Sequence, residues 1–195
     1  MDKRKALSEI AREIQSCPLC RKWGEGLPVP GEGNPDADTL FVGEAPGREE
    51  AKTGRPFVGR SGQLLRSAIR GIGLNEEDVF ITSPVKYRPR SGTPNSENVL
   101  HGRQHFLKQL SIIEPKILVL MGSIACRGVL GEKVEVSKVR GSLISFRGMS
   151  CLVTFHPAYA LRFPAGRREF LRDFKKLKRL IQRLKAKETH EQADR

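Results

Sequence analysis

The chain has 195 residues, of which 38% are hydrophobic and 29% charged, so it is long enough for one globular domain and short of two full ones. Lysine and arginine outnumber aspartate and glutamate by 35 to 22, and the net charge of +13 favours a polyanionic partner, nucleic acid before an anionic membrane surface. The longest apolar run begins at Ile117 and has five residues, far below the roughly 20 that cross a membrane. The first ten residues lack the apolar core of a signal peptide, so we expect a cytoplasmic, nucleoid-associated protein that does not engage membranes.

The predicted elements alternate between strand and helix. Residues 2–15 have helical periodicity, and the stretch 17–35, rich in Gly and Pro, is irregular. Four short apolar runs are predicted strands: Leu40–Val42, Val79–Thr82, Ile117–Met121 and Leu152–Phe155. Helices are predicted near 62–71, 97–112, 123–130 and 167–187, and a polar β-hairpin at 134–149. This order predicts an α/β fold, a three-layer α/β/α sandwich around a central, mainly parallel four-stranded sheet.

The whole chain, 1–195, is expected to form a single domain with a core at about 29–182, a basic helix at 167–187 and a short flexible tail at 188–195. In the basic helix, apolar residues recur every three or four positions from Phe170 to Leu184 and predict one buried stripe. Residues 166–187 carry ten lysines and arginines against Glu169 and Asp173, a net +8. This charge is either a solvated outer face or a footprint for a phosphate backbone.

Cysteines offer a candidate metal site. Cys17 and Cys20 form a Cys-x-x-Cys pair, which without a signal peptide favours half of a metal or iron–sulfur site over a disulfide. Two reduced thiols in a loop are the alternative. Cys126 and Cys151 lie in apolar segments and are expected to be small buried hydrophobes.

Polar residues follow each predicted strand. Glu44 stands in a Gly-Glu-Ala-Pro-Gly loop at 43–47, Ser83 follows the second strand, and His156 follows the fourth. Because the carboxyl ends of parallel strands meet at one sheet edge, these groups are expected to form an acid–base or polar-recognition pocket with free amides of the loops. The loop lacks the GK[ST] ending of a nucleotide-triphosphate site. Phe57, in a loop tightened by Gly and Pro, is either core or a flat face for a stacked base.

Together these segments resemble the family-4 uracil-DNA glycosylases, the iron–sulfur branch of the uracil-DNA glycosylase superfamily. The resemblance extends from the CPLC segment to about residue 180. The residues that carry it are VPGEGNPDADTLFVGEAPGREEAKTGRPFVGRSGQLL (29–65), DVFITSPVKYRP (78–89), EPKILVLMG (114–122), GEKVEVSKVRG (131–141) and TFHPAYALR (154–162).

The resemblance implies a DNA glycosylase that flips uracil, or a related deaminated base, out of DNA and hydrolyses its N-glycosidic bond, with no metal required for the cleavage. It implies that Glu44 positions or activates the attacking water, assisted by Glu50, and that His156 donates to a uracil oxygen as charge builds there. Phe57 would stack on the flipped base. The remaining implied contacts are Ser83, Gly43 and Ala45 to the base, Tyr159, Leu161 and Arg162 as the wedge that fills the gap in the DNA, and Lys86, Arg60 and Ser61 to the DNA.

This sequence departs from the family at the base-reading position. The family carries Asn where Ser83 stands, and an amide offers uracil both a donor and an acceptor. Acceptance of other deaminated bases, or slow turnover of uracil, is therefore expected.

A second departure concerns the cluster. The family holds a [4Fe–4S] cluster with four cysteines, of which only Cys17 and Cys20 match; Tyr87 stands at the third position, and the fourth falls near His101. His101 and His105 share a helix face, so with the two thiols they offer a tetrahedral set for zinc. Loss of any metal, with packing in its place, is the alternative.

The leading prediction is a monomeric glycosylase acting on uracil-containing DNA in base-excision repair. A non-catalytic DNA-binding relative of the same fold is the alternative.

Overall fold

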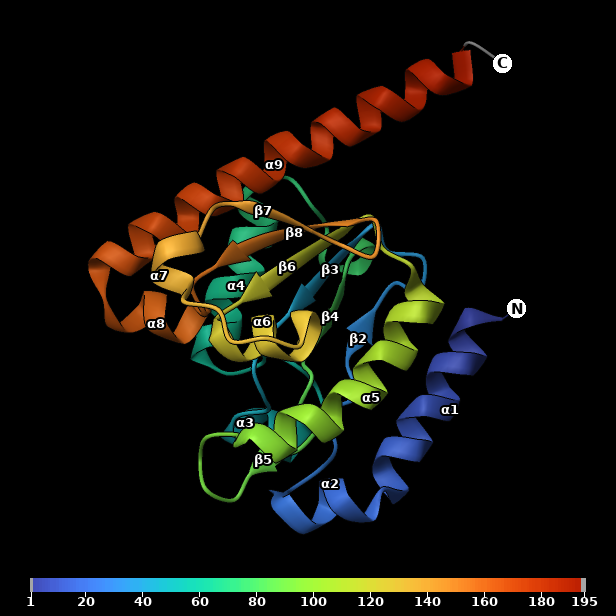
Figure 1. The fold of residues 1–195 in the computed structure, drawn as a ribbon, viewed down its shortest axis with the longest axis vertical. Coiled ribbons are helices and arrows are strands. Elements are labelled where there is room, and N and C mark those ends of the chain that lie inside the picture. The colour runs from blue at the N-terminus through green and yellow to red at the C-terminus, as the bar shows by residue number, and fades with distance from the viewer. Residues whose placement is uncertain (1, 194–195) are drawn as a thin grey trace.

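The computed structural model describes residues 2–193 (Figure 1). Its helices are α1 (Lys3–Ser16), α2 (Pro18–Trp23), α3 (Arg48–Thr53), α4 (Arg60–Gly71), α5 (Ser96–Ile113), α6 (Ser123–Leu130), α7 (Val136–Val139), α8 (Pro157–Arg162) and α9 (Pro164–Ala193), with a 3-10 turn at Glu76–Asp78. Its strands are β1 (Gly24–Glu25), β2 (Glu32–Gly33), β3 (Thr39–Val42), β4 (Phe80–Thr82), β5 (Arg88–Pro89), β6 (Ile117–Met121), β7 (Leu143–Phe146) and β8 (Met149–Thr154).

The central sheet has six strands in the order β2-β4-β3-β6-β8-β7, and a separate two-stranded ribbon pairs β1 with β5. The four inner strands are the predicted ones, and they run parallel. The edge strands β2 and β7 pair antiparallel; β2 was not predicted, because its two half-exposed residues carry little apolar pattern, whereas β7 lies in the second half of the predicted hairpin. The predicted α/β class, with a mostly parallel sheet between helical layers, is confirmed.

The contacts of alternate residues along β6 show that helices cover both faces of the central sheet. Val119 and Met121 pack on one face with Phe174 of α9, whereas Leu118 and Leu120 pack on the other face among residues of α5 and α6. A strand with both faces covered is apolar throughout, as β6 is. Helices α4, α8 and α9 lie on the first face and α5 and α6 on the second, with α1 packed on α5.

The predicted hairpin at 134–149 is wrong in its first half. Short helix α7 occupies part of that segment, and the hairpin is formed by β7 and β8 instead. Its turn falls at Arg147 and Gly148, which have φ values of 49° and 81°. Positive φ at both turn residues is the geometry that matches the twist of a tight hairpin.

Helix α9 is longer than predicted. It begins at Pro164, and residues 188–193 of the predicted tail continue it; residues 194–195 lie outside the described residues. The helix is anchored by Phe170, Phe174 and the fully buried Asp173. The Asp173 carboxylate accepts hydrogen bonds from the Thr154 hydroxyl (2.9 Å) and from Arg140 Nε (3.0 Å), which ties α9 to β8 and to the segment after α7. No helix within residues 2–193 is long and apolar enough to span a membrane.

Candidate active site

A cleft of about 270 Å³ opens beyond the carboxyl ends of the parallel strands, where the sequence predicted a pocket. Its walls include six of the predicted site residues that bear on the base or the reaction: Glu44, Ala45, Glu50, Phe57, Ser83 and His156. Ser61, Val29, Pro46, Gly47, Pro56, Gly92 and Ala158 complete the lining. The cleft therefore lies between the loops that follow β3, β4 and β8. Its volume is large enough for one planar base.

Glu44 lies two residues beyond β3, and its side chain is half-buried. Burial raises the pKa of its carboxyl group above the usual range. Among the described residues, none donates a hydrogen bond to this carboxylate. It is consequently free to bind a water molecule or a group of a ligand.

His156 is the N-cap of α8, and the backbone N–H of Ala158 donates a hydrogen bond to its Nδ1 at 3.2 Å. Burial lowers the pKa of the imidazole to about 4, so the ring is neutral at pH 7. A neutral ring with an accepting Nδ1 carries its proton on Nε2. The helix start thus fixes His156 as a hydrogen-bond donor through Nε2.

Phe57 forms a flat wall beside the histidine, with ring centroids 5.9 Å apart. Its φ of 53° is unusual for a bulky residue, and its carbonyl accepts a hydrogen bond from Arg66 Nε at 3.0 Å. The ring lies over Gly43, where an added Cβ would come within 2.5 Å of Phe57 Cζ. Gly43 therefore makes room for the ring. Its own backbone N–H donates to the Thr82 carbonyl at 2.8 Å, so the free amides expected in these loops do not include that of Gly43.

Glu50 is buried, and both of its carboxylate oxygens are engaged by backbone. One oxygen accepts the N–H groups of Val58 (2.9 Å) and Gly59 (2.8 Å), and the other accepts that of Gly47 (3.1 Å). The carboxylate thereby joins the loop after β3 to the loop that carries Phe57. With both oxygens occupied in this way, Glu50 acts as a positioning residue.

The prediction that Lys86 contacts DNA is wrong. Its side chain is 1% exposed, and its ammonium group donates to Thr82 Oγ1 (2.8 Å), Gln109 Oε1 (2.6 Å) and the Pro30 carbonyl (3.2 Å). A lysine that is enclosed in this way cannot reach a phosphate. Burial lowers the pKa of Lys86 to about 7.

The predicted wedge lies on α8, at the mouth of the cleft. Tyr159 and Leu161 are 43% and 40% exposed, and Arg162 lies over the ring of Phe163. Phe163, itself 41% exposed, was missed although it follows Tyr159 by one helical turn and contacts its ring, with centroids 4.7 Å apart. Arg60, at the start of α4, is also exposed. Glu44, His156 and Tyr159 also line an adjoining groove of about 740 Å³, so the cleft and the groove meet at Glu44 and His156.

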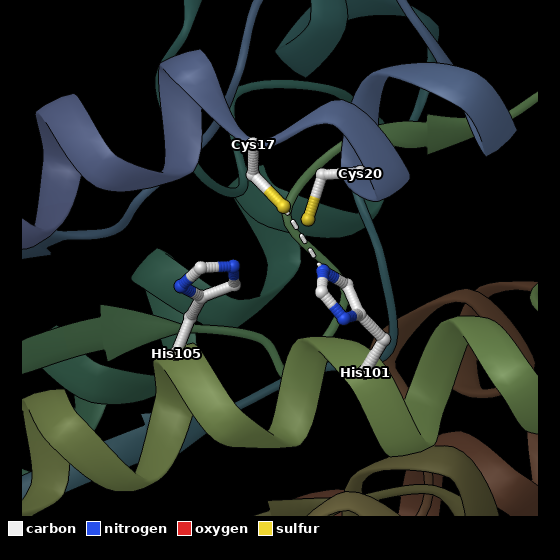
Figure 2. A group of neighbouring side chains, drawn as sticks. All are labelled: Cys17, Cys20, His101 and His105. Carbon is white, nitrogen blue, oxygen red and sulfur yellow. Dashed lines mark hydrogen bonds between the residues drawn. The ribbon is translucent and has the colours of Figure 1, made fainter.

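The four predicted metal ligands come together where α1 and α2 pack against α5 (Figure 2). Cys17 and Cys20 come from the junction of α1 and α2, His101 and His105 from one face of α5, and their ligand atoms all lie within 4.8 Å of one another. Cys17 Sγ lies 3.1 Å from His101 Nε2.

His105 is buried, yet neither of its ring nitrogens has a hydrogen-bond partner. Glu13 Oε1 lies 3.2 Å from its Nδ1, outside hydrogen-bond geometry. A buried imidazole without partners is costly unless a ligand satisfies it. The donor set fits a single tetrahedral ion of the kind that two thiols and two imidazoles hold.

A four-thiolate iron–sulfur cluster does not fit these residues. Tyr87, at the third cysteine position of the family, is buried with Cys20, and its hydroxyl donates to the Gln15 carbonyl at 3.3 Å. Cys126 and Cys151 lie in the core between the sheet and α5, as predicted, and not in this group.

Comparison with known proteins agrees with the geometry. The family model of the uracil DNA glycosylase superfamily matches residues 30–184. The type-4 uracil-DNA glycosylase of Thermotoga maritima is 41% identical over 91% of this chain and 94% of its own length, and that of Sulfurisphaera tokodaii is 39% identical over 90% and 84%. A type-5 uracil-DNA glycosylase of Pyrobaculum aerophilum is 30% identical over 70% and 67%. This chain belongs to the uracil-DNA glycosylase superfamily, and its near-full-length similarity to type-4 members confirms the predicted glycosylase class.

The bridge made by Glu50 generates a prediction. In Glu50→Gln, the amide NH₂ faces the N–H of Gly47, so that N–H loses its charged acceptor, at a cost of about 1–3 kcal/mol. We expect a matching fall in the free energy of unfolding in urea and a loss of excision rate as the Phe57 wall shifts. Glu49→Gln is the matched control, because Glu49 is an exposed neighbour paired with Lys52. Wild-type stability and rate in Glu50→Gln would contradict the positioning role.

Proposed function

We propose that this protein removes uracil from DNA by hydrolysing the bond between the base and its deoxyribose, with Glu44 and His156 acting on the reacting atoms. The observation that carries the proposal is the meeting of a half-buried, unbonded carboxylate and a neutral imidazole in one base-sized cleft. A base inside a duplex cannot be reached, so the nucleotide is flipped into the cleft.

His156 supplies the donor for the leaving base. When the glycosidic bond breaks, negative charge builds on the uracil ring and its oxygens. The Nε2–H of a neutral His156 stabilises that charge, and a prepositioned donor of this kind contributes about 10²–10³ in rate. Because the Ala158 N–H fixes Nδ1 as the acceptor, the ring needs no proton rearrangement before it donates.

Glu44 supplies the carboxylate for the sugar and the water. The deoxyribose gains positive character in the transition state, and an ionised Glu44 stabilises it and accepts a proton from the attacking water. The water adds at the sugar carbon, and the base leaves as an anion that takes up a proton from solvent.

Phe57 and Ser83 would hold the base. The Phe57 ring offers a flat face for stacking, and the Ser83 hydroxyl donates its only hydrogen to the Val85 carbonyl at 2.7 Å. Ser83 can then only accept, from the imide N–H of uracil or the equivalent N–H of hypoxanthine. We therefore propose that the protein excises deaminated bases beyond uracil.

The groove at the mouth of the cleft would receive the DNA strand, and Tyr159, Leu161 and Arg162 would fill the gap left by the flipped base. Arg60 and Ser61, beside the Phe57 loop, would contact the backbone. All of these residues belong to one chain, which supports action as a monomer. Because the substrate is DNA, we propose a cytoplasmic, nucleoid-associated location.

Replacement of the carboxylate tests the reaction. Glu44→Gln keeps the shape of the side chain but cannot accept a proton, so we expect excision of uracil from labelled oligonucleotides to fall about 10²–10⁴-fold while DNA binding is retained. In the wild-type protein the ionised form is needed, so the rate falls as the pH drops through the raised pKa of Glu44; His156 stays neutral down to about pH 4.

The control is Glu49→Gln, which removes an exposed carboxylate outside the cleft and is expected to leave the rate unchanged. Binding of DNA without excision of any base by the wild-type protein would favour the non-catalytic alternative.

Ser83 generates a prediction about base choice. Ser83→Asn adds a donor for the uracil carbonyl, so the ratio of kcat/KM for uracil to that for hypoxanthine should rise about two- to tenfold, the value of one hydrogen bond. Ser83→Ala removes the acceptor and should lower both rates. An unchanged ratio in Ser83→Asn, measured with matched single-stranded substrates, would exclude Ser83 as a base-reading residue.

We also propose that Cys17, Cys20, His101 and His105 hold a structural zinc ion in place of the family's cluster. Two thiolates and two imidazoles form a common closed zinc site, which pins the α1–α2 junction to α5. The buried ring of His105, whose nitrogens make no hydrogen bond, and the mutual approach of the four ligand atoms support the proposal. The site lies away from the cleft, so the ion stabilises the fold and does no chemistry on DNA.

Metal analysis tests the site. The purified protein should contain about one zinc per chain, and Cys17→Ser should lose it and unfold at a lower temperature. Cys126→Ala is the control, because it removes a buried thiol outside the group. Iron with labile sulfide in the protein, or wild-type zinc content in Cys17→Ser, would contradict the assignment.

A further inference from the structure

The outer face of α9 carries a row of cations that the proposed reaction does not use. Arg168, Arg172, Lys175, Arg179 and Arg183 follow one another at spacings of four, three, four and four residues, and all are exposed. At 3.6 residues per turn they form one line, called here the basic ridge, on the side of α9 away from the buried Phe170 and Phe174.

Acidic neighbours do not neutralise the ridge. The segment 166–187 has two acids, Glu169 and Asp173, and Arg140 pairs with both from the inner side of the helix. Arg172 also pairs with Glu169, at 3.0 Å. For the other four ridge residues, none of the acidic side chains that the structure describes lies at ion-pair distance.

The ridge starts next to the wedge. A single residue, Phe163, separates α8 from α9, and these helices pack against each other. Figure 1 shows α9 leaving α8 and running past the sheet until its far end extends beyond the body of the protein. With a rise of 1.5 Å per residue, the ridge from Arg168 to Arg183 is about 22 Å long.

We infer that the basic ridge binds the phosphates of DNA that flanks the flipped nucleotide, on one side of it only. Charge complementarity selects the partner, because a line of unneutralised cations that leads away from the wedge matches a polyanion that passes over it. At 3.4 Å per nucleotide, 22 Å corresponds to about six base pairs of flank. The direction of the flank rests on the proposed function, but the binding of DNA phosphates by the ridge does not.

The test variant replaces three ridge residues with glutamine: Lys175→Gln, Arg179→Gln and Arg183→Gln. With a uracil-free duplex, its affinity at low salt should be about 10- to 100-fold weaker than that of the wild type, and the slope of log K against log salt should be shallower by about 0.9 per lost contact. With uracil-containing duplexes, KM should rise and kcat should stay unchanged.

The control variant removes the same charge elsewhere: Arg4→Gln, Lys5→Gln and Arg12→Gln. These residues are exposed on α1, which packs on α5 across the sheet from α9. The control should bind with nearly wild-type affinity and slope. Matched melting temperatures confirm that all three proteins are folded.

Substrates with unequal flanks locate the contact. When the flank on the ridge side of the uracil is only three base pairs long, the ridge variant and the wild type should have the same KM. When that flank is long, their KM values should differ. Equal losses in the ridge and control variants would show a general charge effect and overturn the inference. An unchanged salt slope in the ridge variant, or a KM that does not depend on the length of either flank, would also overturn the inference. A failure of uracil excision would leave the uracil-free binding result standing, so the two proposals are judged separately.

Discussion

The active site depends on one buried carboxylate. Glu50 accepts three backbone N–H groups from two loops that the sheet alone does not join. This bridge holds the loop after β3 against the loop of Phe57, and the glycine at position 43 leaves space for the ring between them. A buried carboxylate without partners would be costly, but hydrogen bonds from three backbone N–H groups stabilise the charge of Glu50. The position of the Phe57 wall beside His156 follows from that bridge.

The sequence predicted the site because the site follows from sheet topology. Once four strands run parallel, the residues just beyond them, such as Glu44, Ser83 and His156, must meet at one edge, so local patterns sufficed. Roles that depend on contacts distant in sequence were not predictable in the same way. Glu50 has the sequence of an ordinary solvated helix residue, and only its bonds to residues eight and nine positions on show its function. Lys86 stands three residues after a site serine, but its side chain turns inward to polar groups that the sequence does not mark.

The candidate metal site shows the same division. Helical periodicity placed His101 and His105 on one face, and the Cys-x-x-Cys spacing placed the two thiols together. The 80-residue separation between these pairs is closed by the packing of α1 and α2 on α5, which no local pattern reports. What the structure adds is energetic: neither ring nitrogen of the buried His105 makes a hydrogen bond, which is costly unless a ligand satisfies them. Packing alone therefore does not account for this group of residues.

Strong net charge and a working carboxylate place opposite demands on the protein. Cations attract DNA, but a cation beside Glu44 would lower the pKa that burial raises and so make the carboxylate a weaker acceptor for the proton of the attacking water. The structure separates the two needs. Arg66, which holds the Phe57 backbone, is paired with Glu32 and Glu76, so its charge is compensated where it is close to the cleft. A row of further cations lies along α9, where it can attract a phosphate backbone without altering the groups that break the bond.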